Sequence, residues 1–196
     1  MGFDIYGLNP RQHKEKPEIL NKNYLDLIDK VEQAQYFEAK NQYEQETPGT
    51  YFRNNVWWWR PLWEYIIGIS GTLLTPEQRQ GGYENSCTQI PENITRAIAR
   101  RLSHEISSGN HKRYETAYRE TIKNLELEDC EHCNATGQRE WEDGPRDCNA
   151  CNTTSTREQG IPPGQRESWE ASYPFDAENV EEFRIFLEQS GGIEIC

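Results

Sequence analysis

The sequence predicts an α+β fold: a small antiparallel sheet with several helices and an inserted hairpin that carries four cysteines. Short segments of alternating apolar and polar residues stand at both ends of the chain, which is typical of strands. Between them, apolar residues recur at helical spacing. Two C-x-x-C turns follow in a polar stretch, and 6 Trp, 10 Tyr and 6 Phe but a single Met supply the material for the core.

The overall charge restricts the classes of partner. A net charge of −12 repels phosphate backbones, so non-specific nucleic-acid binding is not expected. No apolar run approaches eighteen residues and none follows a basic N-terminal segment, which predicts neither a membrane span nor a signal peptide. We therefore expect a cytoplasmic protein.

The first elements are a strand and a helical addition. Gly2 to Gly7 alternates between glycines, which predicts a strand with Phe3 and Ile5 facing inward. The segment 17–47 contains one narrow apolar stripe on otherwise polar faces. It predicts a long surface helix or a helical hairpin added at the periphery of the domain, with the stripe formed by Leu20, Tyr24, Leu27, Ile28 and Val31.

The stretch Tyr51 to Trp63 holds four of the six Trp residues. Because Arg60 precedes a proline, its backbone is disfavoured in the α region, whereas Pro61 suits the first turn of a helix. This predicts an extended run up to residue 60 and a helix after it. Alternation would then place Trp57 and Trp59 on one face and Trp58 with Arg60 on the other. Three adjacent Trp residues cannot all point into one core, so at least one should lie at a boundary or line a pocket.

The remaining elements follow from caps and spacing. A cap at Thr75 begins a short helix, and longer helices are expected from Pro91 to Ser108 and from Arg113 to Leu125. Trp169 to Phe175 alternates as a strand, Asp176 caps a last helix, and Ile193 to Ile195 alternates again. We expect the two terminal strands to pair in one antiparallel sheet, completed by segments near Tyr51 and Trp169. The predicted domains are an aromatic-rich α+β core, 1–125 with 165–196, and a zinc-ribbon-like hairpin, 126–160.

The strongest functional signal is the pair of cysteine turns. Four thiolates on two tight turns match the tetrahedral shell of Zn²⁺, and a shell filled by four sulfurs leaves no position for a catalytic water. The predicted ligands of a structural zinc ion are Cys130, Cys133, Cys148 and Cys151. His132 lies inside the first turn and is the alternative ligand, although a solvent-facing position fits it better. Trp141 is the main apolar residue of this segment, so loss of zinc should unfold it.

Two resemblances accompany these residues. The run Cys130-x-x-Cys133-Asn134-Ala135-Thr136-Gly137 resembles one C-x-x-C-x-G-x-G unit of the zinc region in DnaJ-type chaperones, over about thirty residues, which implies a zinc turn and not a chaperone. The motif YFRNNVWWWRPLW, the zinc pair and the terminal strands together resemble a family of small uncharacterised phage and bacterial proteins. That resemblance implies a phage or bacterial origin, with the host cytoplasm as location for a phage protein, but no established chemistry.

The side chains favour a binding protein over an enzyme. Cys87 with His104 is the only thiol and imidazole pair to consider as catalytic, and no spacing supports it. Aromatic rings, guanidinium groups and amides concentrate in one short run, which suits a nucleotide-like anion such as a host defence signal. The candidate ligand-binding residues are Arg53, Asn54, Asn55, Trp58 and Arg60. Alternatively, the Trp residues belong to the core and the zinc hairpin is an adaptor that binds another protein, for instance a host protein.

Overall fold

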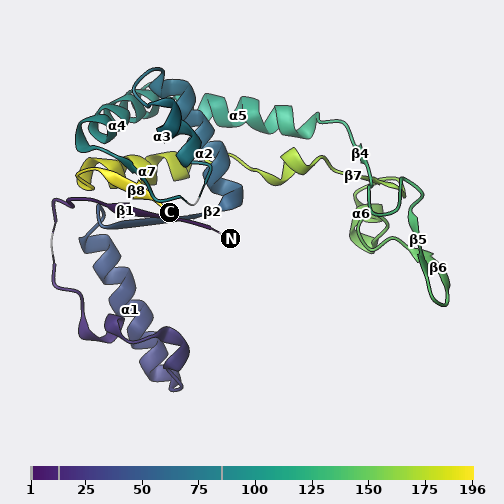
Figure 1. The fold of residues 1–196 in the computed structure, drawn as a ribbon, viewed down its shortest axis with the longest axis horizontal. Helices are drawn as coiled ribbons and strands as arrows, with labels where there is room; N and C mark the ends of the chain where they lie inside the picture. The colour runs from purple at the N-terminus through teal and green to yellow at the C-terminus, as the bar shows by residue number, and fades with distance from the viewer. Residues whose placement is uncertain (1, 13, 85) are drawn as a thin grey trace. The chain divides into compact units, whose positions relative to one another are not determined.

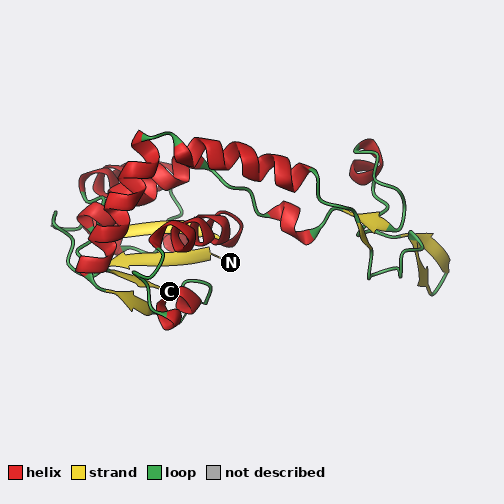
Figure 2. Ribbon diagram, turned by 90° about the horizontal axis from the view of Figure 1, so that it is seen from above, coloured by secondary structure: helices red, strands yellow, loops and turns green. Residues whose placement is uncertain are grey.

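The α+β class and the small antiparallel sheet are confirmed. The computed structural model describes residues 2–12, 14–84 and 86–196. Its largest sheet has the strand order β2-β1-β8-β3, with helices packed against it (Figures 1 and 2). These strands are β1 (Gly2–Gly7), β2 (Tyr51–Asn55), β3 (Thr88–Ile90) and β8 (Ile193–Ile195). The chain divides into two compact units, residues 1–115 with 175–196 and residues 116–174, which are called the first and second unit below.

The two terminal strands pair as the sequence predicts. β1 and β8 are antiparallel, with Ile5 opposite Ile195, and the expected inward residues Phe3 and Ile5 are buried. The prediction that a strand at Trp169 completes this sheet is wrong. That segment is a short 3₁₀ helix, η3 (Trp169–Ser172), because the Ser168 side chain caps it by accepting a hydrogen bond from the Glu170 N–H. β3 takes the fourth place and pairs with β8.

Helices of the first unit cover one side of the sheet (Figure 1). They are α2 (Val56–Ser70), α3 (Pro76–Gly81), α4 (Glu92–Ser107) and α7 (Ala177–Gln189), and α5 (Asn110–Lys123) leads into the second unit. The caps predicted at Thr75 and Asp176 are present, since both side chains accept backbone N–H groups. α7 buries the apolar residues expected of it, Val180, Phe183, Phe186 and Leu187.

The extended run predicted up to residue 60 is wrong, because α2 begins at Val56 and contains Pro61. The Asn55 side chain accepts hydrogen bonds from the N–H groups of Trp57 and Trp58 and so caps the helix five residues before the predicted start. Pro61 then lies in the second turn, where the helix lacks one backbone hydrogen bond. The predicted alternation of Trp57 and Trp59 against Trp58 and Arg60 is therefore replaced by helical spacing.

Trp59 and Trp63 form the centre of the first unit's core. Both are fully buried, and their rings stack with centroids 5.5 Å apart. Each indole N–H donates to a backbone carbonyl, from Trp59 to Gly82 at 2.6 Å and from Trp63 to Arg79 at 3.0 Å. A Cβ at Gly82 would lie 2.0 Å from the Trp63 ring, so only glycine fits there. Trp57 and Trp58 are half-buried, which agrees with the expectation that not all adjacent Trp residues enter the core.

The helical segment predicted at 17–47 is interrupted. Two 3₁₀ turns, η1 (Glu18–Asn21) and η2 (Tyr24–Asp26), precede α1 (Lys30–Glu46). The side chains of Asn23 and Asp29 accept the N–H groups of Leu25 and Val31, so each starts a new element. The predicted stripe is divided as a result: Leu20 and Leu27 are buried, whereas Ile28 and Val31 are exposed.

Beyond the end of α5, the second unit contains short elements. They are β4 (Glu128–Asp129) paired with β7 (Gln165–Arg166), the hairpin β5 (Gln138–Trp141) and β6 (Gly144–Asp147), α6 (Thr154–Glu158) and η3. Glu142 and Asp143 form the turn between β5 and β6. β4, β7 and α6 have too few residues to produce a periodic pattern.

The structure contains a disulfide that the sequence reasoning did not foresee. Cys87 and Cys196, separated by 109 positions, are bonded. They flank the register pair Thr88–Ile195 of β3 and β8, so the sheet brings them together. Because Cys87 is bonded, it does not offer the free thiol that the pairing with His104 would require as a nucleophile.

Candidate metal centre

The four predicted cysteines converge in the second unit. All four are buried, and their Sγ atoms lie within 4.8 Å of one another. The Sγ atoms of Cys133 and Cys151 are 3.5 Å apart, and those of Cys130 and Cys148 are 4.0 Å apart. Bonds of about 2.3 Å to one tetrahedral Zn²⁺ would separate sulfurs by about 3.8 Å, whereas a disulfide would require about 2.05 Å. The donor set and its spacing fit one metal ion with four thiolate ligands.

The first cysteine turn wraps its backbone around the sulfurs. The N–H groups of Cys133 and Ala135 both donate to the Cys130 carbonyl, at 3.3 and 3.1 Å. Asn134 and Ala135 have positive φ angles of 50° and 60°. This left-handed backbone turns the chain sharply after Cys133. The side chain of His132 is exposed and does not belong to the sulfur cluster.

Gly137 connects the two cysteine turns. Its N–H donates to Cys133 Sγ at 3.3 Å, and its carbonyl accepts the Cys148 N–H at 2.8 Å and the Asn152 side-chain amide at 3.2 Å. Its φ is +73°, and a Cβ would lie 2.7 Å from Pro163 Cβ. The position therefore requires glycine for both conformation and space.

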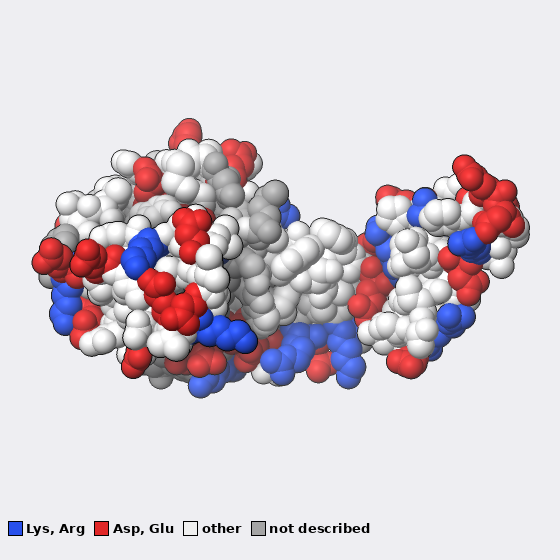
Figure 3. Space-filling model, turned by 90° about the horizontal axis from the view of Figure 1, so that it is seen from below, with Lys and Arg blue, Asp and Glu red and all other residues white. Residues whose placement is uncertain are grey.

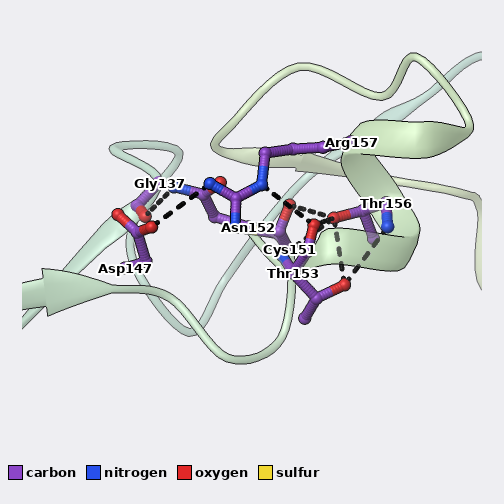
Figure 4. A network of polar contacts seen from close by, with 7 residues as sticks. All are labelled: Gly137, Asp147, Cys151, Asn152, Thr153, Thr156 and Arg157. Atoms are coloured by element: carbon purple, nitrogen blue, oxygen red, sulfur yellow. Dashed lines mark hydrogen bonds and ion pairs between the residues drawn. The ribbon is translucent and has the colours of Figure 1, made fainter.

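Polar side chains hold the second cysteine turn against α6 (Figure 4). Thr153 and Thr156 form a capping box, and the Thr156 hydroxyl donates to the Cys151 carbonyl at 3.2 Å. Arg157 joins this turn to the hairpin through Asp147 Oδ2, at 3.5 Å, and also donates to the Thr153 carbonyl. Backbone and side-chain contacts thus position the sulfurs from both turns.

The packing of the four thiols shifts the pKa values of Cys133 and Cys151 in opposite directions. Burial acts to raise the pKa of Cys133, but the hydrogen bonds from the Gly137 N–H and the other thiols outweigh it, and the pKa falls to about 7. Burial and the hydrogen bond with Cys133 raise the pKa of Cys151 to about 12. Without a cation, the cluster therefore favours one thiolate hydrogen-bonded by neighbouring thiols. A divalent cation would stabilise the remaining thiolates and release their protons.

The second unit has almost no apolar core besides these cysteines. Ile161 is its one other buried hydrophobic residue among those described. The expectation that Trp141 contributes a core is wrong, because its side chain is 48% exposed near the end of the β5–β6 hairpin. A fold that buries so little apolar surface requires another source of stability, and metal ligation supplies one.

Trp141 lies instead beside two cations on one face of the hairpin, where Arg139 and Arg146 are cross-strand partners. The Arg139 and Arg146 guanidinium carbons are 5.8 and 5.9 Å from the centroid of its ring. Contacts at this distance hold the ring in place by cation–π attraction. On the face drawn in Figure 3, basic side chains lie interspersed with acidic ones.

The other candidate site is the Arg, Asn and Trp set at residues 53–60, and part of it serves the fold. The buried Asn54 donates from its amide to Asn179 at 2.9 Å, and Asn55 caps α2. Arg53 is exposed, with its Nε 3.8 Å from Asp4. Trp58 is half-buried and Arg60 is exposed on α2. Ligand binding by these five residues stays a prediction.

Comparison with known proteins found no family model, no curated protein and no solved structure that matches the chain. The resemblance to small phage and bacterial proteins therefore stays a prediction, and the site is interpreted from its own geometry. Within the described ranges, the helices are all too short or too polar to cross a membrane.

Proposed function

We propose that the chain is a non-catalytic, zinc-binding adaptor in which zinc holds the second unit folded and this unit presents Trp141 to a protein partner. The observation that carries the proposal is the exposed Trp141 ring, which has two guanidinium groups within 5.9 Å of its centroid and lies on a hairpin that starts beside the four-sulfur cluster. Tryptophan and arginine are the side chains that most often dominate the binding energy of protein interfaces.

Zinc is the metal that this donor set favours. Four thiolates with tetrahedral spacing select Zn²⁺ or iron among common metals, and zinc requires no redox chemistry to remain bound. Because all four ligands come from the protein, the ion has no open position for substrate or water. The role supported for it is structural.

A protein partner fits the charge of the second unit better than a nucleic acid. Between residues 116 and 174, acidic side chains outnumber basic ones two to one. This excess opposes a phosphate backbone, and thiolate ligands in excess of the charge of Zn²⁺ would increase it. Arg139 and Arg146 then act at short range, around the Trp141 ring, where a partner's carboxylate groups could pair with them.

The proposal is tested by capture of partners from cell extract on the immobilised, zinc-loaded chain. Trp141→Ala should abolish retention of the specific partners, whereas the matched variant Trp169→Ala should retain them, since Trp169 lies in the same unit and is at least as exposed. Retention must also be lost after removal of zinc. Equal capture by wild type and Trp141→Ala would contradict the adaptor proposal, and iron instead of zinc in the purified protein would contradict the choice of metal.

A further inference from the structure

A cavity of about 280 Å³ lies in the first unit, between α1 and the β1–β2 pair. It is far in sequence from the cysteines and does not include the Arg, Asn and Trp set of residues 53–60. Its lining is dominated by four tyrosines and two lysines: Tyr6, Tyr36, Tyr43, Tyr51, Lys16 and Lys40. This combination of rings and cations is the chemistry that the sequence suggested for residues 53–60.

The two walls of the cavity follow from local structure. On α1, Tyr36, Lys40 and Tyr43 are spaced by four and three positions and therefore share one helix face. On the sheet, Tyr6 and Tyr51 are direct cross-strand partners, with ring centroids 5.4 Å apart. No described residue of α1 is buried, so this helix does not fill the space with aliphatic side chains.

Several polar groups of the lining remain available to a ligand. The Tyr51 hydroxyl is engaged, because it donates to Asp4. Across the described ranges, the structure gives no hydrogen bond to the hydroxyl groups of Tyr6, Tyr36 or Tyr43 and no ion pair to Lys16. Lys40 is 3.7 Å from Glu44, an exposed pair that is easily exchanged for a stronger anion.

From this arrangement we infer that the cavity binds a small planar aromatic anion, a single ring system that carries a phosphate or carboxylate group. Tyrosine rings stack on the planar group, while Lys16 and Lys40 bind the anion. The volume is close to the lower limit of about 300 Å³ for small-molecule sites, so one ring system with its anionic group fits better than a dinucleotide.

The lysines also argue against a cationic ligand. Four tyrosines could surround a quaternary ammonium ion, because ring faces attract cations. Two lysines against Glu44 as the single acid of the lining leave an excess of positive charge, which repels such a cation. The inference does not depend on the proposed adaptor function, because the cavity lies entirely in the first unit.

The test is calorimetric titration of the full zinc-loaded chain with adenosine 5′-monophosphate, which serves as the aromatic anion. Adenosine and inorganic phosphate each lack one half of that chemistry and should bind at least about tenfold more weakly. Tetramethylammonium should not bind. Binding of tetramethylammonium, or of phosphate as tightly as of the nucleotide, would overturn the assigned ligand class, and so would no binding of the nucleotide at millimolar concentration.

Variants locate the binding. Lys16→Gln should weaken nucleotide binding about tenfold, whereas Lys30→Gln, at the start of α1 but outside the cavity, should leave it unchanged. Tyr36→Leu should weaken binding by about fivefold or more through loss of stacking. Lys16 is exposed, so its replacement should not alter the melting temperature, which is measured alongside. Equal affinities of Lys16→Gln and Lys30→Gln would overturn the site.

Discussion

Gly137 is the residue on which the geometry of the metal centre depends most. It has a positive φ, contacts both cysteine turns and has no space for a Cβ. Gly137→Ala should therefore destabilise the second unit and weaken zinc binding by about 1–3 kcal/mol. Competition with a chromophoric chelator measures the affinity. Gly144→Ala is a matched control for lost conformational freedom, because Gly144 also has a positive φ but open space around its Cβ. Equal effects of the two substitutions would contradict the connecting role of Gly137.

Substitutions of Asn55 test whether its side chain stabilises the fold or binds a ligand. Its side chain caps α2, so Asn55→Ala should lower the free energy of unfolding by about 1 kcal/mol, while Asn55→Asp should retain the cap. Chemical denaturation measures both variants. If the wild type and Asn55→Ala unfold at the same denaturant concentration, the cap contributes nothing, and a ligand role for this amide regains support.

Among the elements, the sequence predicted those whose signals are local. Thr75 and Asp176 start helices because their side chains bond to nearby N–H groups, and the alternation at Ile193 to Ile195 matches a strand with one buried face. The start of α2 was misplaced because Pro61 was treated as a first-turn residue, whereas Asn55 provides the better cap. β3 was missed because Thr88-Gln89-Ile90, unlike Ile193 to Ile195, does not alternate between apolar and polar residues, and its place depends on β8 from the far end of the chain.

The same distinction applies to the candidate sites. The four cysteines were predictable because each turn brings two ligands together within four residues. The tyrosine cavity was not predictable, because Tyr6 and Tyr51 meet Tyr36 and Tyr43 only after the sheet and α1 have formed. The sequence identified aromatic anion chemistry but assigned it to the densest run of rings, two of which, Trp59 and Trp63, are core.

The contact between α5 and α7 confers a pH dependence. The buried His111 lies 3.0 Å from Glu181 through Nε2, and this hydrogen bond holds the pKa of Glu181 below its ordinary value of about 4.5. A lowered pKa in the folded state stabilises the fold above the unfolded value, and this contribution is lost as the pH falls through the folded value. Glu181→Gln should therefore destabilise at pH 7 and have a smaller effect near pH 3.5. Urea titrations at both pH values measure this, with Glu120→Gln on α5 as an exposed control. If Glu181→Gln lowered the free energy of unfolding equally at both pH values, the Glu181 pKa would not be the cause of the pH dependence.

At the scale of the whole molecule, the two units should differ in their response to chelation. The first unit has an aromatic core, whereas the second buries little beyond its cysteines. Removal of zinc or the substitution Cys133→Ser should unfold the second unit and leave the first intact. Near-ultraviolet circular dichroism, dominated by the buried Trp59 and Trp63, should persist while hydrogen exchange in residues 126–160 becomes fast. Persistent protection there without metal, or undiminished zinc in Cys133→Ser, would show that the four thiols do not hold the unit together.

The Cys87–Cys196 bond joins two strands of the first unit's sheet and closes a loop of 109 positions, more than half of the 196-residue chain. A cross-link that closes so long a loop restricts the unfolded chain strongly, so its reduction should lower the free energy of unfolding by about 2–4 kcal/mol. The bonded residues flank paired strands, and the native sheet should therefore survive reduction with a lower melting temperature. Comparison of wild type with Cys87→Ser, each with and without reductant, isolates the effect from the metal cysteines, because zinc is kept saturating throughout. The reductant should destabilise wild type alone. The contrary result would be a reductant that leaves wild type unchanged, together with six free thiols titrated in the unreduced protein after unfolding and chelation. The two cysteines would then be unbonded in solution, and hydrogen bonding between β3 and β8 would suffice to hold this edge of the sheet.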